Sequence, residues 1–338
     1  MQRSSRSTIP KVAAELALID RIRQRAQRSS GAVSLGIGDD CALLRARPGE
    51  EIAVTTDLSI EGRHFRRDLH PPEAVGHRAI ARGLSDLAAM GARPLAAFLS
   101  LGLPPELTRP ARRGAPAWSD RFLDGLLRLA DQQKTPLAGG DLAECSMPLA
   151  DIVLIGAVPR GKALLRSGAR PGHSIYVTGS LGGSAFGLQL LNSGRKQSES
   201  ELARHLWPQP RIQQGLWLRR RGATSAAIDI SDGLSTDLHH LCQESGVSAE
   251  INQASLPTFP GASLDDALHG GEDYELLFTA PPGARLPHTI AGVPLTQVGT
   301  VKRHRGSAPR LVLVSSGKKQ PLEPRGWEHF RPRKAKPE

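Results

Sequence analysis

Six aspartates stand beside glycine, serine or threonine, at points where strands and loops are expected to end. They occur in the short motifs GIGDD, TTD, LSD, GGD and DISDG, and they are Asp40, Asp57, Asp86, Asp141, Asp229 and Asp232. Carboxylate oxygens bind hard cations, and Mg2+ is usually held by one or two carboxylates together with the phosphates of a substrate. A set of such acids around one cleft would therefore hold several metal ions on a polyphosphate.

Each motif also has a purely structural interpretation. Asp39 and Asp40 could cap a turn, because aspartate accepts hydrogen bonds from nearby backbone amides. Asp57 could be a solvated strand end, and Asp141, which follows two glycines, could complete a tight turn. Ser231 in DISDG could N-cap the helix that follows, where acids are also favoured. Taken singly, the motifs leave both interpretations open.

The sequence lacks the motifs of the common nucleotide-binding and hydrolytic sites. There is no GxxxxGK followed by Ser or Thr, no GxGxxG at the start of a helix, no HRD or DFG, no HExxH and no GxSxG. The usual evidence for a P-loop, a protein-kinase or a Rossmann mechanism is thus missing. Phosphates bound by this chain would have to be held by metal ions and loop amides.

In the first half of the chain, the spacing of apolar residues predicts the elements that position the aspartates. Helices are expected at 10–28, 71–92 and 119–133, and strands at 51–57, 94–104 and 149–158. We expect Asp57 to end the first of these strands and Ser119 to N-cap the third helix. TPLAGGDLAEC, which contains Asp141, is expected to be a glycine-bearing loop.

Around residues 159–171 the pattern breaks with Pro, Gly and basic residues, and a second alternating series follows. Strands are expected in HSIYVTG, SAAIDI, GGEDYELLFTA, VPLTQVGTV and RLVLVSS, and helices through Leu191, near 200–206 and 210–221, and in LSTDLHHLCQESG. This order predicts an α/β (α+β) protein with mixed sheets flanked by helices. Its expected parts are an N-terminal helix and basic arm (1–29), an N-terminal domain (30–159), a C-terminal α/β domain (160–330) and a basic tail (331–338).

The formal net charge of +11 is concentrated at the two ends of the chain. Residues 1–35 carry seven Lys and Arg against two acids, residues 301–338 carry eleven against three, and the middle has 26 basic and 28 acidic residues. Only 4% of the residues are aromatic and able to stack on bases. The motif-bearing body therefore argues against nucleic-acid binding, although a basic nucleic-acid-binding protein without catalysis stays the alternative from another class.

Cysteine usage and hydropathy predict a cytoplasmic location. Cys41, Cys145 and Cys242 lie far apart without CxxC spacing, which excludes a zinc ribbon and gives no disulfide framework. No stretch approaches the roughly 18 uninterrupted apolar residues of a membrane span. The Arg/Ser-rich start lacks the apolar core of a secretion signal, and a transit peptide is the alternative for it.

Nine motifs occur in an order that resembles the thiamine-monophosphate kinase family. They are GIGDDCALL, TTD, EGRHF, LSDLAAMGA, GGD, RSGARPGHSIYVTG, IDISDGLSTDL, GGEDYELLFT and GWEHF, and they span about residues 30–330. The wider superfamily includes aminoimidazole ribonucleotide synthetase, selenophosphate synthetase and a hydrogenase-maturation protein. The resemblance implies the two-domain aminoimidazole ribonucleotide synthetase-like fold, with ATP and metals bound by the N-terminal domain, and a homodimer.

The resemblance further implies direct in-line transfer of the γ-phosphoryl group of ATP to thiamine monophosphate, the final step of thiamine diphosphate biosynthesis, with several Mg2+ ions. The residues are physically compatible with this reaction. A phosphate monoester with a second pKa of about 6 is largely dianionic at pH 7, so it needs no general base. Metal ions would reduce the repulsion between two polyanions and align them.

Carried over position by position, the resemblance assigns three sets of residues. The metal ligands are Asp40, Thr55, Thr56, Asp57, Asp86, Asp141, Asp229 and Asp232. The nucleotide contacts are Gly140, Asp141, Arg166 and Ser231, and the thiamine monophosphate pocket contains His64, Glu272 and Trp327. Of these residues, Asp57, Asp141 and Asp232 are expected to be catalytic.

Some of these residues have simpler roles open to them. Arg166 and His64 could be ordinary surface residues. Trp327 could stack on a thiamine ring, with cation–π attraction to its thiazolium, or it could only pin the C-terminal segment to the body.

The chain departs from the family pattern in or beside three of these motifs. Gly83 replaces an Asn, Leu142 and Ala143 replace threonines, and Trp327 replaces the Tyr of GYDHF. We expect these changes to affect ATP affinity and detailed geometry more than the class of reaction. Aminoimidazole ribonucleotide synthetase shares the architecture but has neither EGRHF nor GWEHF, and it stays the alternative enzyme.

Overall fold

The computed structural model describes residues 11–26, 31–38, 41–112, 114–194 and 198–327, which form two compact units. The first unit takes in Thr56–Ile80, Leu95–Ile155 and the described part of Met1–Arg47. The second takes in Pro48–Thr55, Ala81–Pro94 and the described part of Gly156–Glu338. Two segments of the N-terminal half, one with Thr55 and one with Asp86, are thus grouped with the C-terminal half.

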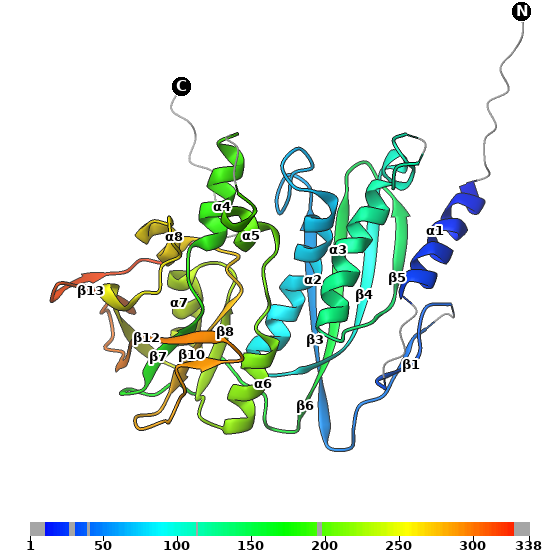
Figure 1. Ribbon diagram of the computed structural model, residues 1–338. Helices are drawn as coiled ribbons and strands as arrows, with labels where there is room; N and C mark the ends of the chain where they lie inside the picture. The colour runs from blue at the N-terminus through cyan, green and yellow to red at the C-terminus, as the bar shows by residue number, and fades with distance from the viewer. Residues whose placement is uncertain (1–10, 27–30, 39–40, 113, 195–197, 328–338) are drawn as a thin grey trace, which may run out of the picture. The chain divides into compact units, whose positions relative to one another are not determined.

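A four-stranded sheet with the strand order β3-β6-β4-β5 organises the N-terminal half (Figure 1). Its strands are β3 (Glu50–Ile60), β4 (Arg93–Leu103), β5 (Leu137–Glu144) and β6 (Leu149–Pro159), with β4 and β5 parallel. Helices α2 (Pro72–Ala89) and α3 (Trp118–Gln132) lie beside this sheet. The remaining elements are α1 (Lys11–Ala26), the antiparallel pair β1 (Val33–Leu35) and β2 (Leu43–Leu44), and the short 3-10 helix η1 (Pro105–Thr108).

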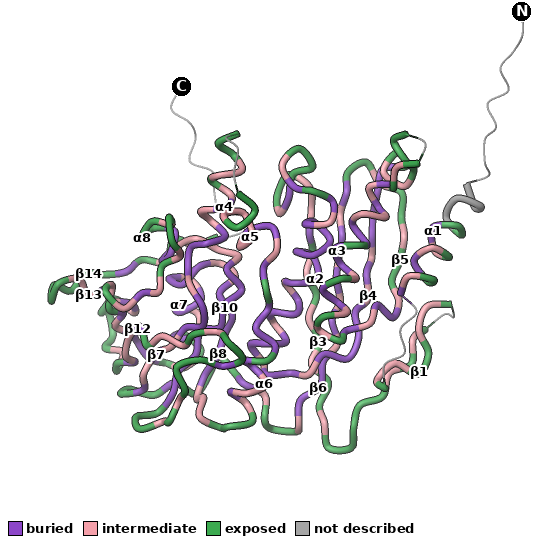
Figure 2. Tube along the Cα trace, viewed as in Figure 1, coloured by how far each residue is buried: buried purple, intermediate pink, exposed green. Residues whose placement is uncertain are grey.

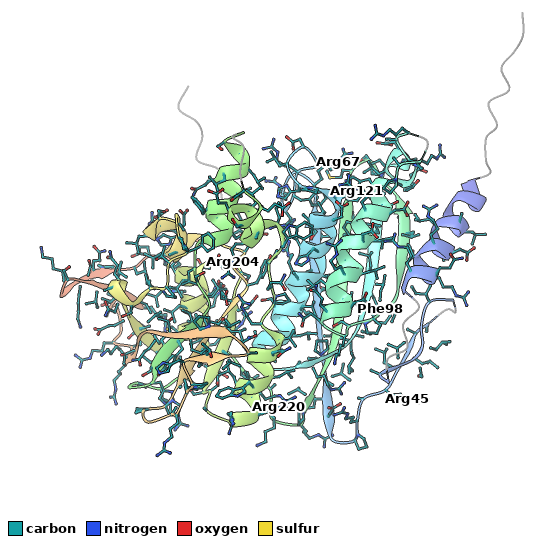
Figure 3. All side chains as sticks on the ribbon, in the orientation of Figure 1. Arg45, Arg67, Phe98, Arg121, Arg204 and Arg220 are labelled. Carbon is teal, nitrogen blue, oxygen red and sulfur yellow. The ribbon has the colours of Figure 1, made fainter. Side chains whose placement is uncertain are left out.

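Helices α2 and α3 meet backbone to backbone at two glycines. A Cβ on Gly125 would lie 1.8 Å from the carbonyl oxygen of Glu73, and one on Gly76 would lie 1.9 Å from that of Phe122. Glycine is the residue that permits so close an approach, because it has no Cβ. Arg121 of α3 adds a bidentate ion pair with Glu73, at 2.7 and 2.8 Å (Figure 3). Helix α2 is thereby held along its first turns.

The C-terminal half is built on a mixed sheet with the strand order β14-β13-β9-β12-β7-β10-β8, to which β11 adds beside β12. The strands are β7 (Ser174–Thr178), β8 (Ala226–Ile230), β9 (Val247–Asn252), β10 (Glu275–Ala280), β11 (Thr289–Ile290), β12 (Val293–Arg303), β13 (Leu311–Ser315) and β14 (Lys318–Pro321). The helices are α4 (Gly183–Asn192), α5 (Glu199–Leu206), α6 (Ile212–Arg221), α7 (Leu234–Glu244), the 3-10 helix η2 (Gln253–Ser255) and α8 (Leu264–His269). The pair β9 and β13 is parallel, and β7, β8, β10 and β12 pair antiparallel with their neighbours.

Strands β10 and β8, the last two in the strand order of this sheet, are deeply buried. Every residue of both strands is buried (Figure 2). The apolar side of α7 contributes Leu234, Leu238 and Leu241 to the same core, each with 0% exposure. The loop that joins β8 to α7, which carries DISDG, therefore starts from a well-packed strand and ends in a well-packed helix.

The predicted fold class is confirmed, because mixed sheets flanked by helices make up both halves. The helices expected at 10–28 and 71–92 and the strands expected at 94–104 and 149–158 are also confirmed, with ends that differ by at most three residues. Strands β9 and β14 and helix α8 were not predicted. The basic tail, 331–338, lies outside the described residues.

Three local predictions are wrong. Asp57 does not end its strand, since β3 continues to Ile60. TPLAGGDLAEC is not a loop: residues 137–144 form β5, in which Asp141 lies beside Ser100 of β4. Its glycines serve close strand packing, because a Cβ on Gly140 would lie 1.9 Å from the Leu99 carbonyl oxygen.

The third error concerns the start of α3. Ser119 lies inside the helix, and the N-cap residue is Ala117. The carboxylate of Asp120 accepts the backbone N–H of Ala117 at 3.3 Å. The acid in the first turn therefore accepts the N–H of the N-cap residue, and the N-cap side chain itself accepts no hydrogen bond.

Candidate functional site

The loop between β8 and α7 is held by one carboxylate of the helix that follows it. Asp237 Oδ2 accepts the backbone N–H groups of Ser231, Asp232 and Gly233 at 3.1, 3.0 and 3.0 Å. Gly233 is the N-cap residue of α7, so Ser231 does not N-cap that helix. Because three donors converge on one oxygen, the main chain on both sides of Asp232 is fixed.

A second set of contacts within the second unit joins Asp229 to the LSD motif of α2. Ser85 Oγ donates to Asp229 Oδ2 at 2.7 Å, and these two residues are 0% and 4% exposed. The next residue of α2, Asp86, accepts a hydrogen bond from Thr55 Oγ1 of β3. Three of the predicted metal ligands, Thr55, Asp86 and Asp229, are thus linked through consecutive residues of one helix.

Negative charge accumulates around the β8–α7 loop. Burial raises the pKa of Asp237 well above its usual range, and the charges of Asp229 and Asp232 raise it further. Ligand atoms of Asp232, Asp237 and His240 lie within 4.8 Å of one another. A bound cation would relieve this repulsion, and the oxygen donors present are those that Mg2+ prefers.

The other predicted ligands that the structure describes lie in the first unit, on β3 and β5. Asp57 is half-buried and shares one face of β3 with Thr55, whereas Thr56 is exposed on the opposite face. Asp57 and Asp141 lie on the two outer strands of the sheet, three strand spacings or roughly 14 Å apart in a flat sheet. The sheet therefore does not bring these two carboxylates to one metal ion. Asp40 lies outside the described residues.

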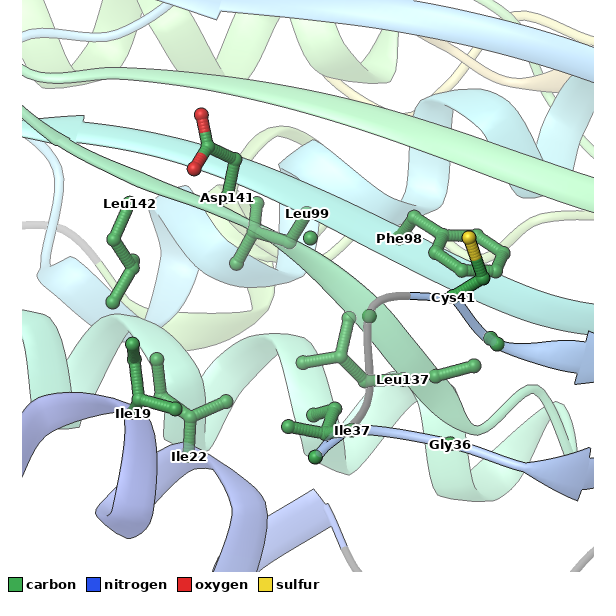
Figure 4. A pocket seen from close by; sticks show the side chains of 15 residues that line it. Ile19, Ile22, Gly36, Ile37, Cys41, Phe98, Leu99, Leu137, Asp141 and Leu142 are labelled. Carbon is green, nitrogen blue, oxygen red and sulfur yellow. The ribbon is translucent and has the colours of Figure 1, made fainter. Parts of the chain in front are cut away.

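An apolar pocket of about 640 Å³ adjoins Gly140 and Asp141 in the first unit (Figure 4). Helix α1 contributes Ile19 and Ile22 to it, the segment before β2 contributes Ile37, β4 contributes Phe98, and β5 contributes Leu137 and Leu142. The Asp141 side chain is exposed. A flat apolar ring could be enclosed here, with a carboxylate beside it for a metal-bound phosphate.

Two residues of the predicted thiamine monophosphate pocket are bonded through their main chains to the β8–α7 loop. The N–H of Glu272 donates to the carbonyl oxygen of Ser231 at 2.7 Å, and that of Trp327 to the carbonyl oxygen of Asp232 at 3.0 Å. Glu272 has a φ of +65°, which is rare for a residue with a side chain. The Trp327 side chain is 50% exposed. Glu272 and Trp327 thus lie beside Ser231 and Asp232.

His64 and Arg166 take no part in these main-chain contacts. His64 Nδ1 accepts the backbone N–H of Ile60 at 3.0 Å, which ties EGRHF back onto the end of β3. Arg166 is exposed, and its carbonyl oxygen accepts a hydrogen bond from Ser245 Oγ at 2.9 Å. Both side chains are half-buried or exposed and so are accessible to a ligand.

Sequence reasoning missed three residues of this site, Ser85, Asp237 and His240. Asp237 had a usable signal, because an acid in the first turn of a helix favours hydrogen bonds with the free N–H groups there. Ser85 had none, since its partner Asp229 is 144 residues away in the chain.

The chain is similar to known proteins along most of its length. Residues 38–158 match the family model described as AIR synthase related protein, N-terminal domain, and residues 170–310 match the model for the C-terminal domain. The thiamine-monophosphate kinase of Escherichia coli (strain K12) is 39% identical over 333 residues, covering 94% of this chain and 98% of that protein.

Two solved structures are similar over most of their length. The thiamine-monophosphate kinase from Stenotrophomonas maltophilia K279a is 38% identical with a TM-score of 0.76, covering 89% of this chain and 96% of that one. The structure described as AaThiL complexed with AMPPCP and TMP is 34% identical with a TM-score of 0.73, covering 96% of this chain and all of that one. Among the described residues, no helix is both long and apolar enough to cross a membrane.

Proposed function

Because the chain belongs to the thiamine-monophosphate kinase family, we propose that it transfers the γ-phosphoryl group of ATP to the phosphate of thiamine monophosphate, giving thiamine diphosphate and ADP. The observation that carries the proposal is the similarity over 96% of the chain to a structure that holds AMPPCP and TMP. In that structure the ATP analogue stands in for ATP, so the positions of both substrates of this reaction are occupied together.

The residues described above suit a transfer without a general base. The acceptor phosphate is already largely dianionic at pH 7, so the protein has only to bring two polyanions together in line. Three hydrogen bonds to Asp237 fix the main chain around Asp232. Such preorganisation lowers the cost of aligning charged groups.

We propose that several Mg2+ ions bind, with ligands drawn from Asp40, Thr55, Thr56, Asp57, Asp86, Asp141, Asp229 and Asp232. The donor set supports this choice, since it consists of carboxylate and hydroxyl oxygens. The repulsion that raises the pKa of Asp237 also favours a cation beside the β8–α7 loop. When bound, Mg2+ would neutralise phosphate charge and orient the oxygens of both substrates. Asp57, Asp141 and Asp232 are the proposed catalytic residues among these ligands.

The apolar pocket beside Gly140 and Asp141 is the proposed site of the adenine ring. Its lining of aliphatic side chains and Phe98 suits a flat base, and Leu142 offers it apolar contact. Arg166 and Ser231 are the proposed phosphate contacts of the nucleotide. His64, Glu272 and Trp327 are the proposed contacts of thiamine monophosphate, with Trp327 against the cationic thiazolium ring.

We also propose a homodimer, supported by an exposed apolar row on β3. Ile52, Val54 and Leu58 alternate along this edge strand and are 49%, 60% and 45% exposed. Alternation of this kind on one face indicates a surface that another chain covers. A second copy of this chain is the proposed partner.

We also propose that the N-terminal domain spans residues 30–159 and the C-terminal domain residues 160–330. The proposed location is the cytoplasm. The limits are supported by the family models, which match residues 38–158 and 170–310. Cell fractionation would test the location, and separate expression of residues 160–330 would test the second limit.

The reaction is tested with the purified protein, ATP, Mg2+ and thiamine monophosphate. We expect thiamine diphosphate and ADP in equal amounts, measured by chromatography, and loss of product when EDTA replaces Mg2+. The alternative enzyme is tested in parallel with the precursor of aminoimidazole ribonucleotide. Product from that precursor, with none from thiamine monophosphate, would reject the proposed function.

A further inference from the structure

The last described residues, 324–327, cross the first turn of α7 and are anchored there by main-chain N–H groups. The N–H of Gly326 donates to Thr236 Oγ1 at 3.0 Å, and that of Arg325 donates to Ser235 Oγ at 3.4 Å. The N–H of Trp327 donates to the carbonyl oxygen of Asp232 at 3.0 Å. Three successive amides thus hold this segment, which we call the C-terminal strap.

Gly326 lets the strap approach the loop closely. A Cβ at this position would lie 2.1 Å from the carbonyl oxygen of Asp232 and 2.6 Å from Thr236 Oγ1. These distances are far below van der Waals contact, so any larger residue would lift the strap from α7. The ion pair between Arg325 and Asp265, at 2.7 Å, joins two exposed side chains and adds little.

The strap is therefore joined to the loop that carries Asp232. That loop is itself fixed by Asp237, so Trp327 stands at a set distance from Asp232. The indole is half-exposed, while the main chain that carries it is anchored. A ligand that stacks on the indole therefore has only the side-chain torsions of Trp327 to restrict, because its main chain is already held.

We propose that Ser235 and Thr236 are positioning residues for the acceptor. Their hydroxyl oxygens hold the C-terminal strap so that Trp327 faces the thiamine ring at a fixed distance from the metal-binding loop. This inference rests on the proposed function and extends it, because it assigns a role to the first turn of α7. A strap that only pinned the end of the chain would change stability without changing the affinity for one substrate.

Three variants test the role of the strap in binding. Thr236→Val removes the acceptor oxygen with little change of volume, Thr236→Ser keeps the oxygen, and Gly326→Ala lifts the strap directly. We expect Thr236→Val and Gly326→Ala to raise the KM for thiamine monophosphate roughly tenfold, with kcat and the KM for ATP within about twofold of wild type, as for the loss of a uniform binding contact. Thr236→Ser should behave as wild type, as should the control Gly31→Ala, whose Cβ would meet nothing within 4 Å.

Two kinetic outcomes would overturn the proposal. One is an unchanged KM for thiamine monophosphate in both Thr236→Val and Gly326→Ala. The other is an equal rise in both KM values with a lower melting temperature, which loss of folding alone would give.

Limited proteolysis measures how firmly the C-terminal strap is held, without relying on enzymatic activity. Cleavage within the strap should be faster in Thr236→Val and Gly326→Ala than in wild type and Thr236→Ser. If the wild type does not phosphorylate thiamine monophosphate, the proposed function is rejected. The cleavage rates still show, independently of activity, whether the hydroxyl of Thr236 holds the C-terminal strap. Equal rates in all four proteins would reject that role.

Discussion

At the scale of single residues, Asp273 shows how a buried acid can fix the segment that carries a ligand contact. Its side chain accepts the backbone N–H groups of Gly182 at 2.6 Å and Ser184 at 3.1 Å, at the start of α4. It lies between Glu272 and Tyr274, whose φ angles are +65° and +51°. Two residues in the left-handed region cost free energy, and the hydrogen bonds of Asp273 help to offset that cost.

The protonation of Asp273 makes the stability of the fold depend on pH. Burial raises its pKa from 3.8 to about 7, the nearby Glu275 adds to the rise, and the two amides and Arg204 oppose it. The folded protein therefore holds a proton that the unfolded chain releases between about pH 4 and pH 7. This contribution to stability is present below pH 4 and is lost as the pH rises through 7.

We expect the variant Asp273→Asn to lack this pH dependence. Between pH 4.5 and pH 8, the free energy of unfolding of the wild type should fall relative to the variant by roughly 3 kcal/mol. Urea unfolding at the two pH values measures the difference. The exposed Asp20→Asn serves as the control, and a difference between wild type and Asp273→Asn that is the same at both pH values would contradict the expectation.

How far the site could be predicted differs from residue to residue. The motif order singled out Asp229, Asp232, Glu272 and Trp327, and the structure brings these four around one loop. The hydrogen bond from Ser85 to Asp229 could not be predicted, since it depends on how α2 and β8 pack. Main-chain hydrogen bonds, such as that from Trp327 to Asp232, do not depend on the type of side chain, so the sequence does not indicate them.

At the scale of elements, the periodicity of apolar residues predicted the helices and strands that have one buried face. It failed at β5, where glycines allow close strand packing and do not mark a loop. The 3.6-residue spacing gave α2 almost to its ends, and the apolar run gave β4. The two glycines before Asp141 indicated a loop, yet they lie in β5 because the strand backbones approach there. The presence of a glycine does not show whether the chain turns at that position or whether another backbone packs closely against it.

Helix packing gives a direct test of this point. Gly125→Ala would place a Cβ 1.8 Å from the Glu73 carbonyl oxygen, so α3 would have to move away from α2. We expect the free energy of unfolding to fall by about 3 kcal/mol, as in other overpacked cores. Thermal and urea unfolding would measure it, with Gly31→Ala as the control. A stability equal to that of the wild type would show that the helices can separate without cost.

At the scale of the whole molecule, the α/β (α+β) class followed from alternation alone, whereas the division into compact units did not. Thr55 and Asp86 belong by sequence to the first half, yet their segments are grouped with the second. This grouping arises from tertiary contacts, such as the close approach of α6 to α2 at Gly215. A Cβ on Gly215 would lie 2.0 Å from the carbonyl oxygen of Ala88. Local patterns carry no information about such contacts.

The proposed homodimer is also tested at this scale. Val54→Asp and Leu58→Lys place a charge on the apolar row of β3, and an unpaired charge buried at an interface is costly. We expect the dissociation constant of the dimer to rise at least about a hundredfold, since 1.4 kcal/mol corresponds to a factor of ten. Light scattering after size exclusion measures this, with the exposed Leu165→Lys as the control. A wild-type protein that is monomeric at micromolar concentration would contradict the proposal.

The C-terminal strap has a consequence for redesign. Its three anchoring bonds all come from main-chain N–H groups, so none of them depends on which side chain occupies position 327. The indole can therefore be exchanged for another ring while its Cα stays in place. Position 327 is thus a point at which the preference for different acceptor molecules could be altered by a single codon, without rebuilding the backbone around the site.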